Sequence, residues 1–343
     1  MDPYGLRRVV SPAGVLPQGA EVLDPSLPLG DDELAVTVES LNVDAASFRQ
    51  LEAATGGDPG RIGEEILRIV RARGKMHNPV TGSGGVLVGR VREVGQAHPA
   101  ASRLHAGERI VTLVSLSLTP LRLSRILAIR PEVERVECEG EAILFATGLW
   151  ARLPEDLPQA VTLAVLDVCG APALTARHLA PGMRVLVLGA GKSGALVAAQ
   201  ARASVGPAGA VVLADRSPAA LKALAGLGAD AWLELDATDP LAGLGAVARA
   251  GGPFDVVVSC TSAPGTEMAS ILAVRSGGVV IFFSMATSFT AAALGAEGVG
   301  KDATLIIGNG YAPGHAALAL DLLRRNAPLR AFFEARYGNR GVP

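Results

Sequence analysis

A strand–turn–helix–strand pattern in the second half of the chain constrains the fold more than any other feature. The apolar run Val185–Leu188 leads directly into Gly189-x-Gly191-x-x-Gly194, and a segment rich in Ala and Leu follows it. A second apolar run then ends on Asp215. In such a unit the first glycine allows a tight turn, the second admits a pyrophosphate, and the third lets helix and strand pack closely. The spacing predicts dinucleotide binding, with the phosphates at the helix N-terminus.

The residues around this turn also bear on the choice of cofactor. A carboxylate at Asp215 would accept hydrogen bonds from a ribose and repel a 2′-phosphate, which favours NAD over NADP. Arg216 beside it leaves two interpretations open, namely contact with adenine or a phosphate and a solvated surface position. Lys192, next to Ser193 in the glycine turn, is equally open to pairing with the pyrophosphate or lying at the surface.

Length and composition set outer limits on function. At 343 residues the chain is long enough for two domains. Hydrophobic residues make up 49%, yet each apolar run is broken before it reaches membrane-spanning length. A net charge of −2 without a basic cluster argues against nucleic-acid binding. Three separated cysteines (Cys138, Cys169 and Cys260) and no apolar leader after the first charges predict a cytoplasmic protein with reduced thiols.

The texture of the chain changes at about residue 150. Before it, short β-branched runs alternate with turns and are interrupted by one amphipathic helix at 62–72. After it, apolar strands alternate with helical stretches, which predicts a doubly wound parallel sheet of about six strands. A helix at 315–325 follows the last strand. The strands predicted are 33–41, 86–94, 108–114, 185–188, 210–214, 255–259, 278–283 and 304–308.

This order of segments resembles the medium-chain dehydrogenase/reductase architecture. Gly89-Arg-Val-Arg-Glu-Val-Gly95 is similar to its G-x-V-x-x-V-G strand, and Ala106–Val111 to its G-D-R-V turn. Leu179–Gly191 resembles the entry to its cofactor site. The resemblance implies an α/β protein with a β-rich, GroES-like catalytic domain at 1–150 and about 313–343, and a Rossmann dinucleotide-binding domain at 151–312.

The departures from that architecture concern zinc. Zinc-dependent members carry Gly-His-Glu before the G-x-V-x-x-V-G strand, an early cysteine and a four-cysteine lobe. Here the corresponding stretch ends in Thr-Gly-Ser-Gly-Gly85, and no cysteine occurs before Cys138. One thiolate at Cys169 does not make a tetrahedral site. We therefore predict no catalytic metal.

Three further segments resemble a narrower family, L-erythro-3,5-diaminohexanoate dehydrogenase. They are Lys75–Gly85, Phe283–Asp302 and Gly308–His315. The resemblance implies NAD-dependent oxidative deamination of the 3-amino group in anaerobic lysine degradation, giving 5-amino-3-oxohexanoate, ammonia and NADH. By analogy, the segment 291–300 is a dimer element, which predicts a homodimer acting on a small diamino acid.

Oxidative deamination requires a base for the amine and groups that bind the charged ends of the substrate. His77, in a loop rich in Gly and Pro, is the best general-base candidate, against a histidine satisfied by backbone. Lys75, Asn78 and Ser83 of the same loop are candidate catalytic residues, with a solvated lysine, a turn cap and a packed loop as the alternatives. Further candidates are Asn42 and, for the distal ammonium, Asp44, which would otherwise cap a turn.

In the second domain, polar residues follow two strands at the edge where ligands of open sheets bind. Thr261 and Ser262 are predicted cofactor neighbours, and Ser284 and Met285 are expected to border the nicotinamide. Two other functions remain open: a zinc-free NADPH-dependent quinone or enoyl reductase, and an NAD-binding sensor without turnover. Asp215 argues against the reductase.

Overall fold

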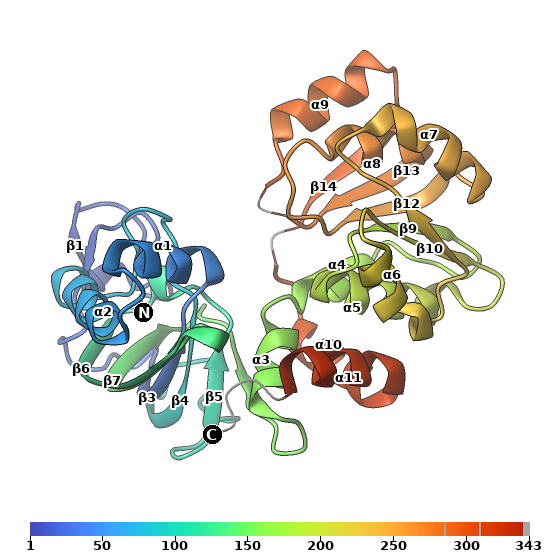
Figure 1. Cartoon of the computed structure of the whole chain (residues 1–343). Coiled ribbons are helices and arrows are strands. Elements are labelled where there is room, and N and C mark those ends of the chain that lie inside the picture. Colours follow the sequence, from blue (N-terminus) through green and yellow to red (C-terminus); the bar gives the residue numbers. More distant parts are fainter. Residues whose placement is uncertain (285, 309, 339–343) are drawn as a thin grey trace. The chain divides into compact units, whose positions relative to one another are not determined.

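The computed structural model describes residues 1–284, 286–308 and 310–338, and the chain divides into two compact units after Gln159 (Figure 1). The first unit contains an antiparallel six-stranded sheet in the order β6-β7-β3-β4-β5-β8. Its strands are β3 (Glu33–Asn42), β4 (Val86–Val94), β5 (Arg109–Thr112), β6 (Leu121–Arg130), β7 (Arg135–Phe145) and β8 (Trp150–Arg152). The short strands β1 (Val9–Ser11) and β2 (Val22–Leu23) pair separately.

Two helices of the first unit are set by their caps. Asp44 caps α1 (Ala45–Thr55) through the backbone N–H of Ser47, and Asp58 caps α2 (Pro59–Arg73) in the same way. Both helices end at a glycine in the left-handed conformation. The apolar stripe of α2 is buried in the core, which confirms the predicted helix at 62–72. Short helical turns are η1 (Leu6–Arg8), η2 (Leu116–Leu118) and η3 (Pro131–Val133).

The second unit is built on an all-parallel sheet in the order β11-β10-β9-β12-β13-β14. Numbered from its first strand, this is the 3-2-1-4-5-6 order of a doubly wound dinucleotide-binding fold, with the switch point between β9 and β12. The strands are β9 (Arg184–Leu188), β10 (Ala210–Asp215), β11 (Ala231–Glu234), β12 (Phe254–Ser259), β13 (Val274–Phe282) and β14 (Ala303–Ile307).

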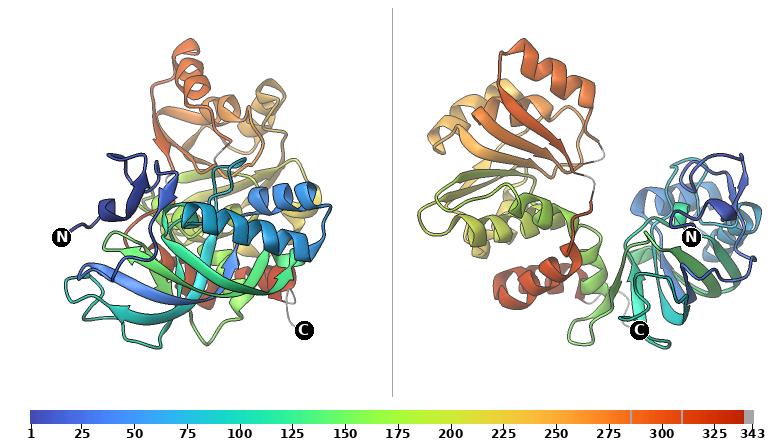
Figure 2. Two further views of the ribbon diagram at one scale, coloured as in Figure 1. Left: turned by 90° about the vertical axis from the view of Figure 1, so that its left-hand side faces the viewer. Right: turned by 180° about the vertical axis from the view of Figure 1, so that it is seen from behind.

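Helices cover both faces of this sheet. Figures 1 and 2 show α7, α8 and α9 on one face and α4, α5 and α6 on the other. The helices are α3 (Gln159–Leu166), α4 (Gly170–Ala176), α5 (Lys192–Val205), α6 (Pro218–Ala223), α7 (Pro240–Arg249), α8 (Glu267–Ala273), α9 (Phe289–Gly298), α10 (His315–Arg325) and α11 (Ala327–Phe333), with short turns η4 (Ala225–Leu227) and η5 (Glu334–Gly338). The central strands β9, β10 and β12 and the second half of β13 are largely buried on both sides, as their continuous apolar runs predict.

All eight strands predicted from the sequence are present, as is the helix at 315–325. The long strands β6 and β7 were not predicted, and neither was β11 at the edge of the parallel sheet. In β7, Val136, Cys138 and Ala142 point into the core while the intervening glutamates form ion pairs with arginines of neighbouring strands. The alternation of apolar and charged residues is therefore present in the sequence, as expected for a strand with one exposed face.

The domain boundaries differ from the prediction at the C-terminal end. The division falls after Gln159 rather than at 150, and residues 313–338 lie in the second unit instead of returning to the first. The physical reason is the packing of the last helices. Helix α10 contacts α4 and α5, and α11 contacts α5 and η4, so their apolar side chains are buried within this unit. Residues 339–343 lie outside the described residues.

In the described part of the chain, no single helix is both long and apolar enough to cross a membrane. The pair α3 and α4, bent by 49° at the break between them, passes by length and composition alone.

Candidate functional site

The glycine turn between β9 and α5 is held by the backbone around it. Gly189 has a φ of 101°, a conformation open mainly to glycine, and its N–H donates to Ala214 O at 2.7 Å. A Cβ on Gly194 would lie 1.8 Å from the carbonyl oxygen of Gly189. These two glycines are thus required by the protein itself, as the motif predicts.

Gly191 is different, because a Cβ there would meet no protein atom within 4 Å. It caps α5 without a side-chain hydrogen bond, and the first turn of α5, which includes Ser193, carries no acidic residue. Free N–H groups and the positive end of the helix dipole therefore remain available to an anion. The open space at Gly191 and the uncapped helix together fit the pyrophosphate of a dinucleotide.

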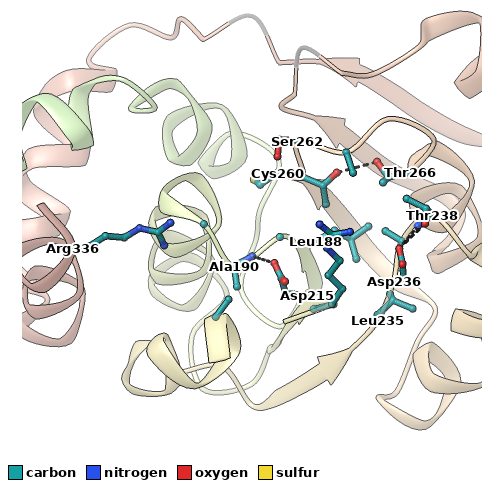
Figure 3. A pocket seen from close by; sticks show the side chains of 18 residues that line it. Leu188, Ala190, Asp215, Leu235, Asp236, Thr238, Cys260, Ser262, Thr266 and Arg336 are labelled. Atoms are coloured by element: carbon teal, nitrogen blue, oxygen red, sulfur yellow. Dashed lines mark hydrogen bonds between the residues drawn. The ribbon is translucent and has the colours of Figure 1, made fainter. Parts of the chain in front are cut away.

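A cavity of about 280 Å³ opens beside this turn, where the strands β9 to β12 end (Figure 3). Six of the predicted cofactor residues line it: Gly189, Gly191, Asp215, Arg216, Thr261 and Ser262. The hydroxyls of Thr261 and Thr266 lie 3.0 Å apart in the same wall. The structure therefore brings these six residues together around one space, as the strand order requires.

The carboxylate of Asp215 is oriented by two backbone N–H groups. Oδ2 accepts from Ala190 at 2.7 Å, and Oδ1 accepts from Ser217 at 2.8 Å. Figure 3 shows the first of these bonds linking the end of β10 to the glycine turn. Each carboxylate oxygen can accept more than one hydrogen bond, so the group can still receive ribose hydroxyls.

The sequence reasoning missed part of this cavity. The segment after β11 contributes Leu235, Asp236, Ala237 and Thr238, and η5 contributes Arg336. Oδ1 of Asp236 accepts from both the N–H and the hydroxyl of Thr238, at 2.9 and 2.7 Å. The only available signal was position, since a strand that follows β10 in this fold ends at the same edge. The remaining lining residues are Leu188, Ala190, Ala214, Ala220, Cys260, Ala263 and Thr266.

Of the other predicted cofactor residues, those that the structure describes do not line this cavity. Lys192 forms an ion pair with Asp167 and, like Ser193 and Gly194, does not line the cavity. The hydroxyl of Ser284 accepts from the N–H of Ala286 at 3.1 Å, closing a turn after β13. Met285 lies outside the described residues.

In the first unit, Lys75 is completely buried. Its Nζ donates to the carbonyl oxygens of Pro17 at 3.1 Å and Ala20 at 2.6 Å. Burial, together with the positive charge of Arg73, lowers the pKa of Lys75 to about 8. This lysine therefore fastens the loop between β1 and β2 to the start of the 75–85 loop, and the described side chain is not available to a ligand.

Asn78 is also buried and fully engaged. Its Nδ2 donates to Gln50 Oε1 at 2.8 Å, and its Oδ1 accepts from the N–H of Val80 at 2.9 Å. The backbone N–H of Asn78 donates to the carbonyl of Ser83 at 2.9 Å. Asn78 thus shapes the loop and holds it on α1, which matches the turn-cap alternative.

His77 lies between these two residues and is only partly buried. Its Nδ1 is enclosed and has no hydrogen-bond partner among the described residues. Burial lowers the pKa of His77 below its usual 6.5, and the charges of Lys75 and Arg73 lower it further. Both effects favour the neutral form of the imidazole.

The substrate-binding candidates gather near this loop. Asp44 caps α1 through Oδ1, and its Oδ2 is enclosed without a partner among the described residues. The hydroxyls of Ser47 and Thr81 lie 2.5 Å apart, which joins α1 to the loop. A Cβ on Gly85 would lie 2.0 Å from Asn42 O, so the loop closes directly against the end of β3. Asn42, Asp44 and Ser83 are each partly buried.

The cysteines and the last histidine have structural surroundings. All three cysteines are free, and burial raises the pKa of each thiol to about 12. His315 is buried, with its ring edge-on to Tyr311. Within residues 1–284, 286–308 and 310–338, no three His, Cys, Asp or Glu side chains come together in a group suited to a metal ion.

Comparison with known proteins identifies close relatives. Residues 7–154 match the family model of the L-erythro-3,5-diaminohexanoate dehydrogenase N-terminal domain. The L-erythro-3,5-diaminohexanoate dehydrogenase of Acetoanaerobium sticklandii is 47% identical over 342 residues, covering 97% of this chain and 98% of the relative. The Fusobacterium nucleatum enzyme of the same name is 47% identical over 338 residues, with the same coverage of 97% and 98%.

Solved structures with lower sequence identity share the fold. A mycobacterial quinone oxidoreductase matches with a TM-score of 0.56 at 19% identity, covering 94% of this chain and 92% of that one. An alcohol dehydrogenase from Thermotoga maritima matches with a TM-score of 0.54 at 19% identity, covering 89% and 85%. These matches show a shared fold, in agreement with the predicted α/β protein that combines a β-rich unit with a doubly wound parallel sheet.

Proposed function

The chain belongs to the L-erythro-3,5-diaminohexanoate dehydrogenase family, and we propose that it catalyses the NAD-dependent oxidative deamination of this diamino acid. Carbon 3 loses a hydride and its amino group, and water supplies the new carbonyl oxygen. The products are 5-amino-3-oxohexanoate, ammonia, NADH and a proton. The observation that carries the proposal is 47% identity across nearly the whole of both chains, which covers both units.

The cavity of the second unit fits NAD, which supplies the hydride acceptor when bound. The N–H groups at the start of α5 would hold the pyrophosphate in the space beside Gly191. Asp215 would receive ribose hydroxyls, and its charge disfavours a 2′-phosphate. Arg336 adds a positive charge to the same cavity and is a further candidate contact for the cofactor.

His77 is the proposed general base. The amine must be neutral before hydride can leave carbon 3, so an imidazole that is unprotonated at neutral pH suits the step. Since Nδ1 is enclosed, Nε2 is the nitrogen that we propose to take the proton. Lys75 and Asn78 are proposed to position His77 rather than to react, because their polar groups are already bonded within the fold.

Asp44 is the proposed partner of the distal ammonium. A buried carboxylate oxygen without a partner is costly, and an ammonium group would satisfy it. Asn42 and Ser83 remain candidate contacts for the rest of the substrate, because the loop closure at Gly85 places both segments together.

We further propose a cytoplasmic homodimer. The free cysteines suit a reducing compartment. Helix α9, the residue that follows it and the edge strand β14 expose several apolar side chains, namely Phe289, Leu294, Val299 and Ile307. An exposed strand edge flanked by apolar side chains is a common site of chain association. Light scattering of the wild type and of L294E would test it; a monomeric wild type would refute the homodimer.

The decisive assay mixes purified protein with L-erythro-3,5-diaminohexanoate and NAD, and follows both NADH and ammonia. Equal amounts of ammonia and NADH, undiminished by a zinc chelator, would support the reaction and its metal independence. Loss of turnover with the chelator, restored by added zinc, would refute metal independence. Absence of turnover with either cofactor, combined with reduction of a quinone by NADPH, would replace this proposal with the reductase.

A further inference from the structure

Two polar contacts fasten the 75–85 loop to helix α1. The hydroxyl of Ser47, which is completely buried, lies 2.5 Å from the hydroxyl of Thr81. Further along α1, Gln50 Oε1 accepts from Asn78 Nδ2 at 2.8 Å. Ser47 and Gln50 are three residues apart in the helix and therefore lie on the same side of it. The loop is thus attached to one face of α1 at two points.

Ser47 also binds Asp44, the proposed partner of the distal ammonium. Its backbone N–H donates to Oδ1 of Asp44 at 2.9 Å, while Oδ2 is enclosed and has no partner among the described residues. The hydroxyl contact of Ser47 with Thr81 is at the short end of the range for O–H···O bonds, so it holds the two side chains closely. Ser47 therefore joins this carboxylate directly to the loop that carries His77.

We propose that Ser47 is a positioning residue that determines substrate specificity, because its bond to Thr81 fixes the spacing between Asp44 and the loop that carries His77. The substrate has amino groups on carbons 3 and 5, and both must reach their partners at the same time. A displacement of about 1 Å in such a site lowers the rate by up to about a hundredfold. A ligand with only one of the two amino groups can shift to fit, so its binding does not depend on this spacing. The inference rests on the proposed roles of Asp44 and His77.

The test compares the whole substrate with two ligands that each carry one of its amino groups, 3-aminohexanoate and 5-aminohexanoate. In Ser47→Ala, kcat/KM for L-erythro-3,5-diaminohexanoate should fall about tenfold, while the competitive inhibition constants of the two monoamino acids change less than about twofold. Thr81→Val removes the other hydroxyl at nearly the same shape and should give the same result. Because the two hydroxyls form one contact, the double variant should lose no more than either single variant.

Thr55→Val is the matched control. Thr55 belongs to the same helix, but its hydroxyl donates to Leu51 O at 2.8 Å within α1, so kcat/KM and both inhibition constants should stay those of the wild type. An unchanged kcat/KM in both Ser47→Ala and Thr81→Val, or losses that multiply in the double variant, would overturn the inference. So would a weakening of either monoamino acid as large as the loss for the substrate, because the substitution would then disturb the site in general. A wild type that does not turn over the diamino acid would instead refute the proposed reaction, and this inference with it.

Discussion

The two units of this protein encode their sites in different ways. In the second unit, the function of each glycine follows from spacing along the chain: Gly194 is required by contact with the turn, and Gly191 leaves open space. In the first unit, three candidates with different outcomes lie close together at the start of the 75–85 loop. Lys75 and Asn78 are bonded within the fold, whereas His77 keeps an unpaired ring nitrogen.

The contrast shows where sequence reasoning is strong. A motif that binds ligand through backbone groups depends on local conformation, which glycine spacing reports directly. A site made of side chains depends on which polar atoms the tertiary structure has already satisfied. Residue type and loop context alone do not distinguish a side chain whose polar atoms are already bonded, such as Lys75, from one with an unpaired polar atom, such as His77.

The strongest challenge to this contrast is the removal of His77. His77→Asn should lower kcat by about a hundredfold or more, since a general base typically contributes that much. NAD affinity, measured by titration, should change little because the cofactor cavity lies in the second unit. His105→Asn, at an exposed histidine of the same unit, is the control and should keep full activity. A His77 variant with normal kcat would return that residue to the structural alternative.

Two glycine substitutions distinguish a glycine that the fold requires from a glycine that leaves room for the ligand. Gly194→Ala should destabilise the protein by about 1–3 kcal/mol, because the new methyl group clashes with the Gly189 carbonyl. Gly191→Ala should leave the unfolding midpoint nearly unchanged, since its φ of −85° suits alanine and nothing lies within 4 Å. It should nevertheless weaken NAD binding about tenfold or more as the methyl group enters the pyrophosphate space. Equal losses of stability in both variants would contradict this distinction.

Much of the fold could be predicted from the sequence, and the reasons for the exceptions are physical. The buried parallel strands are continuous apolar runs, so five of the six in the second unit were predicted. Strand β11 was missed because it lies at the edge of the sheet and is partly exposed, with Trp232 and Glu234 facing solvent. The cavity residues that follow it, Asp236 and Thr238, were missed for the same reason.

The tail shows a second kind of limit. The helix at 315–325 is amphipathic and was predicted correctly, but periodicity does not tell which partner buries its apolar face. Contacts with α4 and α5 determine that partner, and they place residues 313–338 in the second unit. Arg336 reaches the cofactor cavity only because of this packing.

Lys75 offers a smaller and more specific test. Lys75→Met should cost about 1–3 kcal/mol of unfolding free energy, because the carbonyls of Pro17 and Ala20 lose their donor. Urea denaturation measures this loss. The Lys75→Met substitution should also raise the pKa of His77, because the positive charge of Lys75 helps to lower that pKa in the wild type.

The pH profile tests that second effect. In the wild type, kcat/KM should fall on the acid side below 6.5, since His77 must be neutral to accept a proton and its pKa is lowered. In Lys75→Met the midpoint of that fall should move to higher pH. If Lys75 were the base itself, this variant would instead lose turnover at every pH, and the comparison within the loop would be reversed.

The smallest expected effect concerns Lys192, which the motif places near the pyrophosphate and the structure pairs with Asp167. Both side chains are partly exposed, so the ion pair contributes at most about 1 kcal/mol. If this pairing persists when NAD is bound, Lys192→Met and Asp167→Asn should each change NAD affinity by less than about threefold. If Lys192 moves to the pyrophosphate instead, the two variants should act in opposite directions. Lys192→Met would then weaken binding, and Asp167→Asn would strengthen it by releasing the lysine. Opposite changes of NAD affinity in the two variants would add the side chain of Lys192 to the cofactor site of the second unit, beside the backbone groups of the glycine turn.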